Sequence, residues 1–417
     1  MARKMKDSGI EWIGEIPEGW EVATIGHLFS VTAGGDAKPH LYSFVQDAKH
    51  PYPVYTNSSN PNQIYAYTSA PIFNENTITV TGRGDIGHAF YRNTKFDAII
   101  RLLVLAPKSA LDCRYYAYWI DNVSIFFTNS AAVGQLSAQQ ISPYKTCYLP
   151  LCEQQSIANH LDFYCSKIEH ILADIQYSIQ EYKKLKQAVI TQAVTKGVRG
   201  KREMKDSGNP WFGQIPADWK LSRVGLHFSV ILGKMLCNAP LNDTYTLEPY
   251  YCAADVHFDG VADGERKKMW FSPVEKELYR VSVGDLLVVE GGAGAGGSAI
   301  VENQDSDTYI QNSIMIVRSK GNTDNRYLRY LLELLVKQGY IDIVCNKATI
   351  PHFTKDKLSC VPFCLCPTGE QEEIADYLDA KCAEIDKLIA KKEQLVEELE
   401  CYKKSLIYEV VTGKREV

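Results

Sequence analysis

The feature that most constrains this 417-residue sequence is an internal duplication. The pentapeptide Met5–Gly9 recurs as Met204–Gly208, and matching residues continue for some twenty positions at a constant separation of 199. A second match, between Glu153–Cys165 and Glu370–Cys382, has a separation of 217. Because solenoid repeats are roughly 20–45 residues long, so long a period indicates a duplicated pair of domains. We therefore expect two related surfaces on one chain and a bipartite function.

The composition fits two globular domains in solution. At 417 residues the chain exceeds the size of one compact core. Hydrophobic residues make up 45% and charged residues 23%, which are ordinary values for a globular protein. No apolar run reaches the roughly eighteen residues that a membrane-spanning helix needs. No apolar stretch follows the charged start either, so we expect neither a membrane segment nor a signal peptide.

The formal net charge of −5 does not by itself indicate a nucleic-acid-binding protein. It does not exclude one, because local patches set the electrostatic field at a binding groove. If the chain binds DNA, we expect partner subunits to share the phosphate contacts.

The cysteine pattern favours a reducing compartment. Twelve cysteines are scattered among apolar neighbours, without the density of a disulfide scaffold, so we expect a cytoplasmic protein. Cys360, Cys364 and Cys366 cluster, but no CxxC pair joins a second pair or a histidine motif. We interpret this cluster as buried packing and not as a zinc site, and we expect no bound metal.

Helical periodicity is clearest at the end of each half, over residues 153–199 and 370–417. Apolar residues there follow alternating steps of four and three, which is the 3.5-residue period of a coiled coil. The residues expected in the seam between the helices are Leu161, Ile168, Ile175, Leu378, Ile385 and Leu395. So narrow a seam argues against packing along the helix's own domain. We predict an antiparallel pair of helices, ending at Gly197 and Gly413.

The two interiors indicate mixed α/β domains. Strand-like runs cover residues 99–105 and 313–317, and Asp112 and Asp324 occupy matching positions before apolar helical stretches, where they are expected to be N-caps. The C-terminal Gly-Lys-Arg-Glu sequence also precedes Met204, so the chain ends as its second half begins. This cyclic plan predicts a pseudo-twofold arrangement with the two termini close together.

Each interior contains a glycine-rich segment, Gly82–Gly87 and Gly291–Gly297. The first fits the GxGxxG pattern of dinucleotide-binding loops, but the residues that follow it read as a strand and not as the required helix. We therefore interpret both segments as hairpin loops, whose missing side chains allow the backbone to approach a ligand closely.

Motifs of common enzyme classes are absent from the sequence. It contains no GxxxxGK[ST], no HExxH, no GxSxG and no aromatic-ended Asn/Asp-Pro-Pro tetrapeptide. Nine histidines are scattered singly. We therefore expect no catalytic residues, no enzymatic activity and no cofactor bound by this chain.

Polar and basic residues in loop-like segments remain as candidates for nucleic-acid contacts. Arg, Lys, Asn and Gln side chains read base edges, and Lys, Ser and Thr hold phosphates. The candidates in the first half are Lys38, Tyr55, Asn57, Ser58, Arg83, Gln135, Ser137 and Gln139. Those in the second half are Lys234, Arg266, Lys267, Lys268, Glu290, Lys347, Thr349 and His352.

Taken together, the chain resembles the DNA-specificity subunit of type I restriction–modification systems. Leu149–Ala158 (LPLCEQQSIA) followed by a long helix that ends at Ala193–Gly197 (AVTKG) carries this resemblance, and Glu370–Ala375 repeats it. Gly284–Gly292 and Gln311–Ser313 are also typical of the family's recognition domains. The sequence departs from the family at Cys364–Gly369, where the usual Leu-Pro pair is degraded, which leaves the geometry of that loop open.

The resemblance implies a non-catalytic subunit with two α/β (α+β) target recognition domains, residues 1–152 and 200–369. Two antiparallel spacer helices, 153–199 and 370–417, would separate them. Each domain would read one half of an interrupted site in double-stranded DNA. Two methyltransferase subunits carrying S-adenosylmethionine would dock on the helices, and two restriction–translocation subunits using ATP and Mg would join them. No membrane partner is implied.

Two alternatives stay open at this point. A coiled-coil scaffold or adaptor would have the same helices without reading DNA. A nucleotide-binding enzyme would use the glycine-rich segments to hold a cofactor. The sequence names neither the recognised bases nor the length of the spacer between them.

Overall fold

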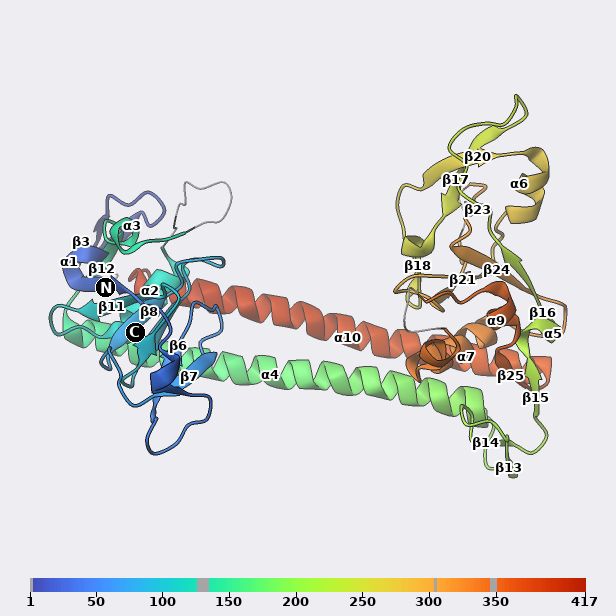
Figure 1. Ribbon diagram of the computed structural model, residues 1–417, viewed down its shortest axis with the longest axis horizontal. Helices are drawn as coiled ribbons and strands as arrows, with labels where there is room; N and C mark the ends of the chain where they lie inside the picture. The colour runs from blue at the N-terminus through green and yellow to red at the C-terminus, as the bar shows by residue number, and fades with distance from the viewer. Residues whose placement is uncertain (1–2, 125, 127–134, 304–305, 346–350) are drawn as a thin grey trace. The chain divides into compact units, whose positions relative to one another are not determined.

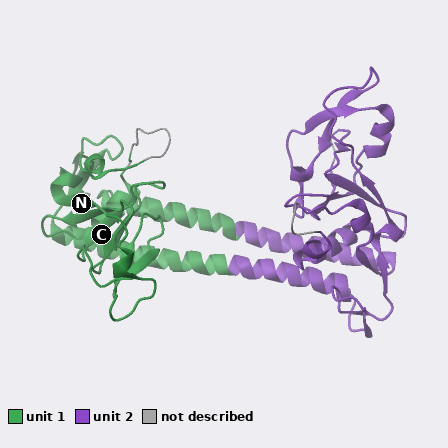
Figure 2. Cartoon of the chain, in the orientation of Figure 1, with its two compact units in different colours: residues 1–177, 392–417 green, residues 178–391 purple. Residues whose placement is uncertain are grey.

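The computed structural model describes residues 3–124, 126, 135–303, 306–345 and 351–417 (Figure 1). They form two compact units, residues 1–177 with 392–417 and residues 178–391 (Figure 2). Each unit combines a mixed α/β domain with one part of each of two long helices, α4 (Leu151–Lys196) and α10 (Thr368–Val411). The units are therefore not the sequential halves of the chain. The first unit includes the end of α10, and the second unit includes the end of α4.

The helices α4 and α10, of 46 and 44 residues, are the longest elements. Each follows a proline, which suits the start of a helix. Each ends before a glycine in the left-handed region, Gly197 at φ 74° and Gly413 at φ 73°, which confirms the predicted ends. Both begin two residues before the predicted positions. They run antiparallel, as predicted: in the second unit Lys186 pairs with Asp386, and Arg199, thirteen residues later, pairs with Glu373, thirteen residues earlier.

The seam between the helices differs from the prediction in one of its two columns. Leu161, Ile168, Ile175, Leu378 and Ile385 are buried. Leu161, Ile168 and Leu378 also belong to the hydrophobic cores of the α/β domains, so the prediction that the helices do not pack on their own domains is wrong for these residues. Leu395 is 42% exposed, so its predicted place in the seam is wrong. The buried or half-buried residues of the second column are Cys165, Leu172, Ile179, Cys382, Ile389 and Val396. Val396 lies one position after Leu395, the residue of this column that the sequence suggested.

This shift has a physical cause in the sequence itself. Tyr164, Ile171 and Leu185 repeat every seven or fourteen residues, as Cys165, Leu172 and Ile179 do. A 3.5-residue repeat fits either column, and only the pairing of the folded helices decides which one is buried. Tyr164, Ile171 and Leu185 therefore stay on the surface and form an apolar stripe.

The first unit is built on an antiparallel sheet in the order β4-β11-β8-β9. Its strands are β4 (Phe29–Ala33), β11 (Leu103–Pro107), β8 (Thr77–Val80) and β9 (Ala89–Arg92). Helix α2 (Cys113–Asn122) packs on β8 and β9 and contributes Trp119 to the core. A second sheet has the order β10-β6-β7-β5. Its strands are β10 (Asp97–Ala98), β6 (Tyr52–Tyr55), β7 (Ile64–Thr68) and β5 (Tyr42–Ser43).

Short elements complete the first unit. The two-stranded pairs are β1 (Met5–Asp7) with β2 (Glu15–Pro17) and β3 (Glu21–Thr24) with β12 (Lys145–Tyr148). The short helices are α1 (Ile25–Leu28), η1 (Pro39–Leu41) and α3 (Ala138–Ile141).

The second unit repeats this plan. Its main sheet, in the order β16-β24-β21-β22, consists of β16 (Phe228–Leu232), β24 (Ile314–Ser319), β21 (Leu286–Val289) and β22 (Ser298–Ile300). Helix α7 (Asn325–Lys337) packs on it, as α2 does in the first unit. The second sheet has three strands, β20 (Lys267–Phe271), β17 (Thr246–Tyr251) and β23 (Tyr309–Ile310). The predicted duplication is therefore present in the fold as well as in the sequence.

The remaining elements of the second unit are short. The strand pairs are β13 (Met204–Asp206) with β14 (Gln214–Pro216), β15 (Lys220–Arg223) with β25 (Pro362–Leu365), and β18 (Val256–His257) with β19 (Gly260–Val261). The helices are α5 (Val224–His227), η2 (Ala253–Asp255), α6 (Pro273–Tyr279), α8 (Tyr340–Val344) and α9 (Lys355–Ser359). Within the described ranges, no helix has both the length and the apolar content needed to cross a membrane.

Local predictions in the two domains are largely met. Asp112 and Asp324 cap α2 and α7 through hydrogen bonds from backbone amides, as predicted. The predicted strand 313–317 is β24, shifted by one or two residues. The predicted strand 99–105 is wrong at its start, because Ile100 and Arg101 adopt φ of 54° and 57° and turn the chain before β11. A run of β-branched and aliphatic residues does not reveal such a turn.

Candidate nucleic-acid interface

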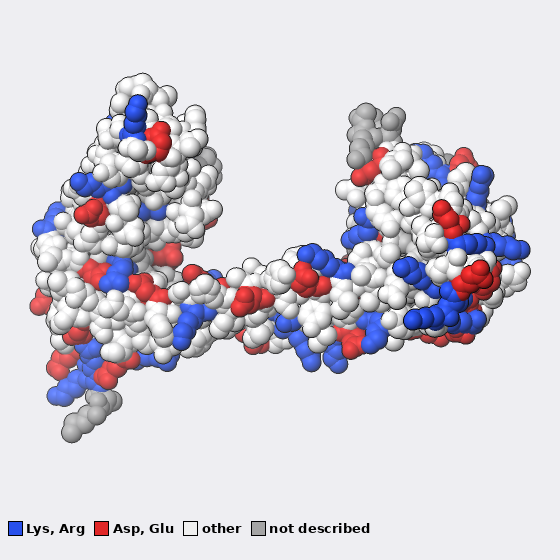
Figure 3. Space-filling model, turned by 90° about the horizontal axis from the view of Figure 1, so that it is seen from below, with Lys and Arg blue, Asp and Glu red and all other residues white. Residues whose placement is uncertain are grey.

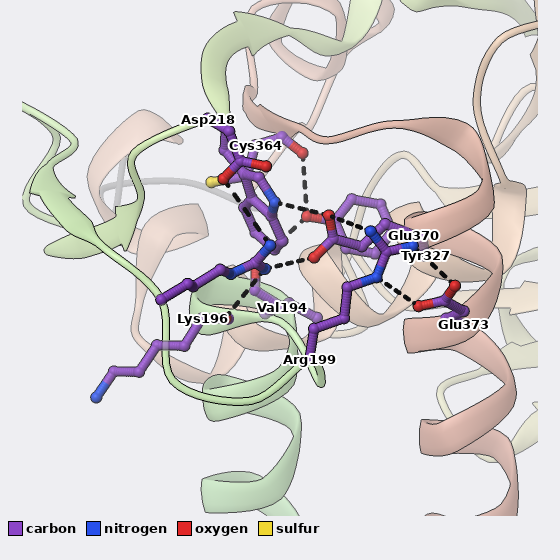
Figure 4. Close-up of polar contacts among 10 residues, drawn as sticks. Val194, Lys196, Arg199, Asp218, Tyr327, Cys364, Glu370 and Glu373 are labelled. Carbon is purple, nitrogen blue, oxygen red and sulfur yellow. Dashed lines mark hydrogen bonds and ion pairs between the residues drawn. The ribbon is translucent and has the colours of Figure 1, made fainter.

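Each α/β domain is fixed to the helices by a polar junction, shown for the second unit in Figure 4. The carboxylate of Glu370 is fully buried and accepts hydrogen bonds from Arg202 and from the indole Nε1 of Trp219, the latter at 3.2 Å. The guanidinium of Arg199 forms a bidentate pair with Glu373 at 2.8 Å. The junction therefore ties the segment after α4 to the start of α10.

The first unit has a similar junction that is partly exposed and has Ser156 in the place of Glu373. Glu153 accepts hydrogen bonds from Arg3 at 2.6 Å and from Trp20 Nε1 at 2.9 Å. Partial burial acts to raise the pKa of Glu153, but these two hydrogen bonds and the positive charge of Arg3 outweigh it and lower the pKa. The sequence carried a signal for this role, because Arg3 and Arg202 stand at the same distance before the repeated pentapeptide.

The glutamine that follows each of these glutamates is also structural. Gln154 donates from Nε2 to the carbonyl of Leu149 at 2.8 Å and accepts from the backbone N–H of Asp112 at 2.9 Å. Gln371 does the same with Cys366 and Asp324. The recurring Glu-Gln pair thus joins a helix start to the N-terminus of α2 or α7, which orients the domain on the helix.

In the first unit, three of the predicted contact residues meet at one loop. The loop runs from Thr81 to His88 between β8 and β9. Asn57 holds it, accepting from Gly82 N at 2.7 Å and donating to the carbonyl of Arg83 at 2.5 Å. Arg83 forms a β-bridge with Gln135, and both residues are exposed. Among the described residues, the Arg83 guanidinium and the Gln135 amide have no hydrogen-bonding partner, so both are free to bind a ligand.

The second unit has an equivalent loop between β21 and β22. Its backbone hydrogen bonds follow the same pattern, with Gly291 in a β-bridge to His352. The Nδ1 atom of His352 lies 3.3 Å from a carboxylate oxygen of Glu290. Predicted residues Glu290 and His352 therefore meet at this loop, while Lys347 and Thr349 lie outside the described residues.

Other predicted residues of the first unit lie near this loop or elsewhere on the surface. The ring of Tyr55 packs 3.6 Å from the guanidinium of Arg92. Ser58 donates to Gln63 at 2.6 Å. Ser137 caps α3, Gln139 is exposed on that helix, and Lys38 precedes η1. The structure brings together Asn57, Arg83 and Gln135 but does not place Lys38 with them.

Sequence reasoning missed Arg92. Its buried guanidinium donates to Thr79 and to the carbonyl of Pro61 and packs on Tyr55. Arg92 lies on the main sheet and Tyr55 on the second one, so no local pattern in the sequence could have paired them.

Two basic residues of the second unit that were predicted to contact DNA form ion pairs within the protein. Lys234 is nearly buried and pairs with Glu275 at 2.6 Å. Arg266 pairs with Asp255 at 3.1 Å and packs on Tyr251. Lys267 and Lys268 are exposed on β20 and stay available. The contribution of each of these residues to DNA contact stays a prediction, and the internal pairs make Lys234 and Arg266 the weaker candidates.

The surface charge is mixed. On the face shown in Figure 3, acidic and basic side chains are interspersed, and much of the visible surface carries neither. Sequence readout by such a surface would depend on individual loop residues more than on one broad basic field. Over the described part of the chain, no group of three or more His, Cys, Asp and Glu side chains is arranged to hold a metal ion.

The fold defines a class of protein with two equivalent α/β domains, each carrying such a loop, on a pair of long helices. Comparison with known sequences identifies the family. The profile of the type I restriction modification DNA specificity domain matches residues 17–179 and 238–398. The chain belongs to this family, and it is a DNA-specificity subunit with two recognition domains.

Individual relatives agree with this assignment. A Methanocaldococcus jannaschii protein named as the MjaX type I restriction enzyme specificity subunit is 26% identical over 96% of this chain and 95% of its own length. A type I specificity subunit of Mycoplasma pneumoniae is 28% identical over 36% of this chain, and the match spans less than half, 46%, of that protein. A solved structure described as showing assembly and conformational transition of a type I R-M system has a TM-score of 0.71 at 14% identity, covering 95% of this chain and 98% of the other. It supports the fold.

Proposed function

We propose that this chain is the non-catalytic sequence reader of a type I methyltransferase and restriction complex. Each unit would read one half of a bipartite, interrupted site in double-stranded DNA. The observation that carries this proposal is the repetition of one loop in both units, closed by two equivalent backbone bonds and carrying different side chains, an exposed Arg83 in one unit and a half-buried Glu290 in the other. Two domains of the same fold can recognise two different half-sites if the side chains of their loops differ.

The helices offer a surface for the methyltransferase subunits. In the first unit the apolar side chains of Tyr164, Ile171, Leu395 and Tyr402 are exposed on α4 and α10. All four lie one position before the same column of the seam, and in an antiparallel pair these positions flank the same side. Leu185 and Leu388 occupy such positions in the second unit. Exposed apolar stripes of this kind mark protein–protein interfaces.

The proposed partners follow from this division of labour. Two methyltransferase subunits would dock on the stripes and bring S-adenosylmethionine, and two restriction subunits would bring ATP and Mg. This chain would bind no cofactor of its own. Its twelve cysteines are free thiols, which supports assembly in the reducing cytoplasm.

The test is methyl transfer to DNA from labelled S-adenosylmethionine. The chain alone should transfer nothing, and the methyltransferase subunits should methylate one defined motif only when the chain is added. Methyl transfer by the rigorously purified chain, or the same motif methylated without it, would contradict the proposal.

A further inference from the structure

The equivalent loops of the two units share two backbone hydrogen bonds that close them, although the second loop is one residue longer. In the first unit, Gly87 N donates to the carbonyl of Thr81 at 3.0 Å, and Leu136 N donates to the carbonyl of Gly82 at 2.7 Å. In the second unit, Gly296 N donates to the carbonyl of Val289 at 3.0 Å, and Phe353 N donates to the carbonyl of Glu290 at 2.6 Å.

These bonds fix which residues correspond. Gly82 is equivalent to Glu290, because their carbonyls accept equivalent bonds. The β-bridges make Arg83 equivalent to Gly291 and Gln135 equivalent to His352. The chain therefore places a cation at the second loop position of one unit and an anion at the first loop position of the other.

The space for a side chain at the vacant position is restricted, severely at Gly82 and less so at Gly291. A Cβ atom on Gly82 would lie 2.7 Å from the carbonyl oxygen of Leu136. A Cβ atom on Gly291 would lie 3.2 Å from Nδ1 of the His352 ring, which is the ring that meets Glu290. The charged side chain therefore stands at the second loop position in the first unit and at the first loop position in the second unit.

We infer that the two units read opposite hydrogen-bonding features of the bases. In the first unit, Arg83 would donate to the acceptors of a guanine (O6 and N7), with Gln135 beside it. In the second unit, Glu290, held by His352, would accept from the exocyclic amino group of a cytosine or adenine. This inference rests on the proposed DNA-reading function and adds the chemistry of each half-site.

Electrostatics separates base contact from phosphate contact at Glu290. A carboxylate beside a phosphate is repelled, whereas a carboxylate beside a base amino group accepts a hydrogen bond. Among the described residues only His352 contacts the carboxylate of Glu290, through one of its oxygens, and the side chain is 17% exposed. Arg83 is suited to the opposite task, because its planar fork matches the two acceptors of guanine.

The experiment maps the motif methylated by the whole complex. Variants Arg83→Ala and Glu290→Ala are each assembled with the methyltransferase subunits, and methylated sites are sequenced in a randomised DNA library. Lys95→Ala and Glu302→Ala are matched controls, since both side chains are exposed and lie away from the loops. Thermal unfolding of each variant confirms that it folds.

The expected result is a change at one base position only. Arg83→Ala should lose preference for guanine in one half of the motif by roughly 5- to 150-fold. Glu290→Ala should lose preference for an amino-bearing base in the other half by a similar factor, and Glu290→Gln should shift that position toward adenine. Both controls should keep the motif unchanged.

Two results would overturn the inference. In one, the wild-type motif is well defined and neither variant alters it. In the other, methylation falls equally at all sites while the motif persists, which would mean phosphate contact. In both cases the proposed function still stands. A wild-type complex that methylates no defined motif would instead contradict the proposed function itself.

Discussion

The phenol hydroxyl of Tyr115 donates a hydrogen bond of 3.0 Å to the main-chain carbonyl of Val411, 296 residues further along the chain. Tyr327, its counterpart in the second domain, lies 3.3 Å from the carbonyl of Val194 at the end of α4. Each recognition domain is thus bonded to the end of the helix that follows the other domain in sequence. This crossing explains why each compact unit contains parts of both helices.

Removing these hydroxyls should destabilise the units. Tyr115 and Tyr327 are fully buried. Phe would remove the bond to the Val411 carbonyl at the first position, and the bonds to the carbonyls of Cys364, at 3.0 Å, and Val194 at the second. We expect a loss of about 1–3 kcal/mol in the free energy of unfolding for Tyr115→Phe and for Tyr327→Phe. The midpoint of denaturant unfolding measures it. Tyr402→Phe, at an exposed position on α10, is the matched control. An equal, small effect of all three would contradict the role of the crossed bonds.

The register of the seam predicts different effects for Ala substitutions at two residues that lie one helical turn apart on α4. Ile168 is buried, and Ile168→Ala should cost about 2–5 kcal/mol of stability. Ile171 is exposed, and Ile171→Ala should change stability by only about 0.5 kcal/mol or less while weakening assembly with the methyltransferase subunits. Unfolding midpoints and size-exclusion titration measure the two effects. If Ile171→Ala proved the more destabilising change, the register given above would be wrong.

The junction at Glu153 should make stability depend on pH. Its pKa is lowered in the folded protein from the ordinary value of 4.5. The carboxylate therefore contributes stability that is present above pH 4.5 and is lost as the pH falls through the lowered pKa. Glu153→Gln should lower the unfolding temperature at pH 7, and the difference from wild type should shrink as the pH falls below 4.5. A difference that does not vary with pH would show that the charge of Glu153 is immaterial.

Much of the scaffold follows from sequence patterns. The duplication predicts the two domains, and the 3.5-residue apolar period with its closing glycines predicts both helices to within a few residues. Asp112 and Asp324 signal their helices because N-capping depends on local chemistry alone. The register of the seam could not be predicted in full, since Tyr164 and Cys165 both begin apolar columns with a seven-residue repeat.

The recognition surface was harder to predict. Arg83, Gln135 and Asn57 were candidates, yet their meeting at one loop depends on a β-bridge between distant segments. Lys234 is of a residue type that often contacts DNA, and only the folded structure shows that it pairs with Glu275. The residue types in a loop can be read from the sequence. The internal partners that neutralise their charges depend on tertiary contacts.

The most direct test of the central claim, that each unit reads one half of the motif, is exchange of a single interior. Residues 20–150 are replaced by the corresponding segment of a family member with a different motif, and the methylated motif of the assembled complex is sequenced. One half of the motif should change to that of the donor protein while the other half is retained. A motif in which both halves change, or neither does, would contradict the account.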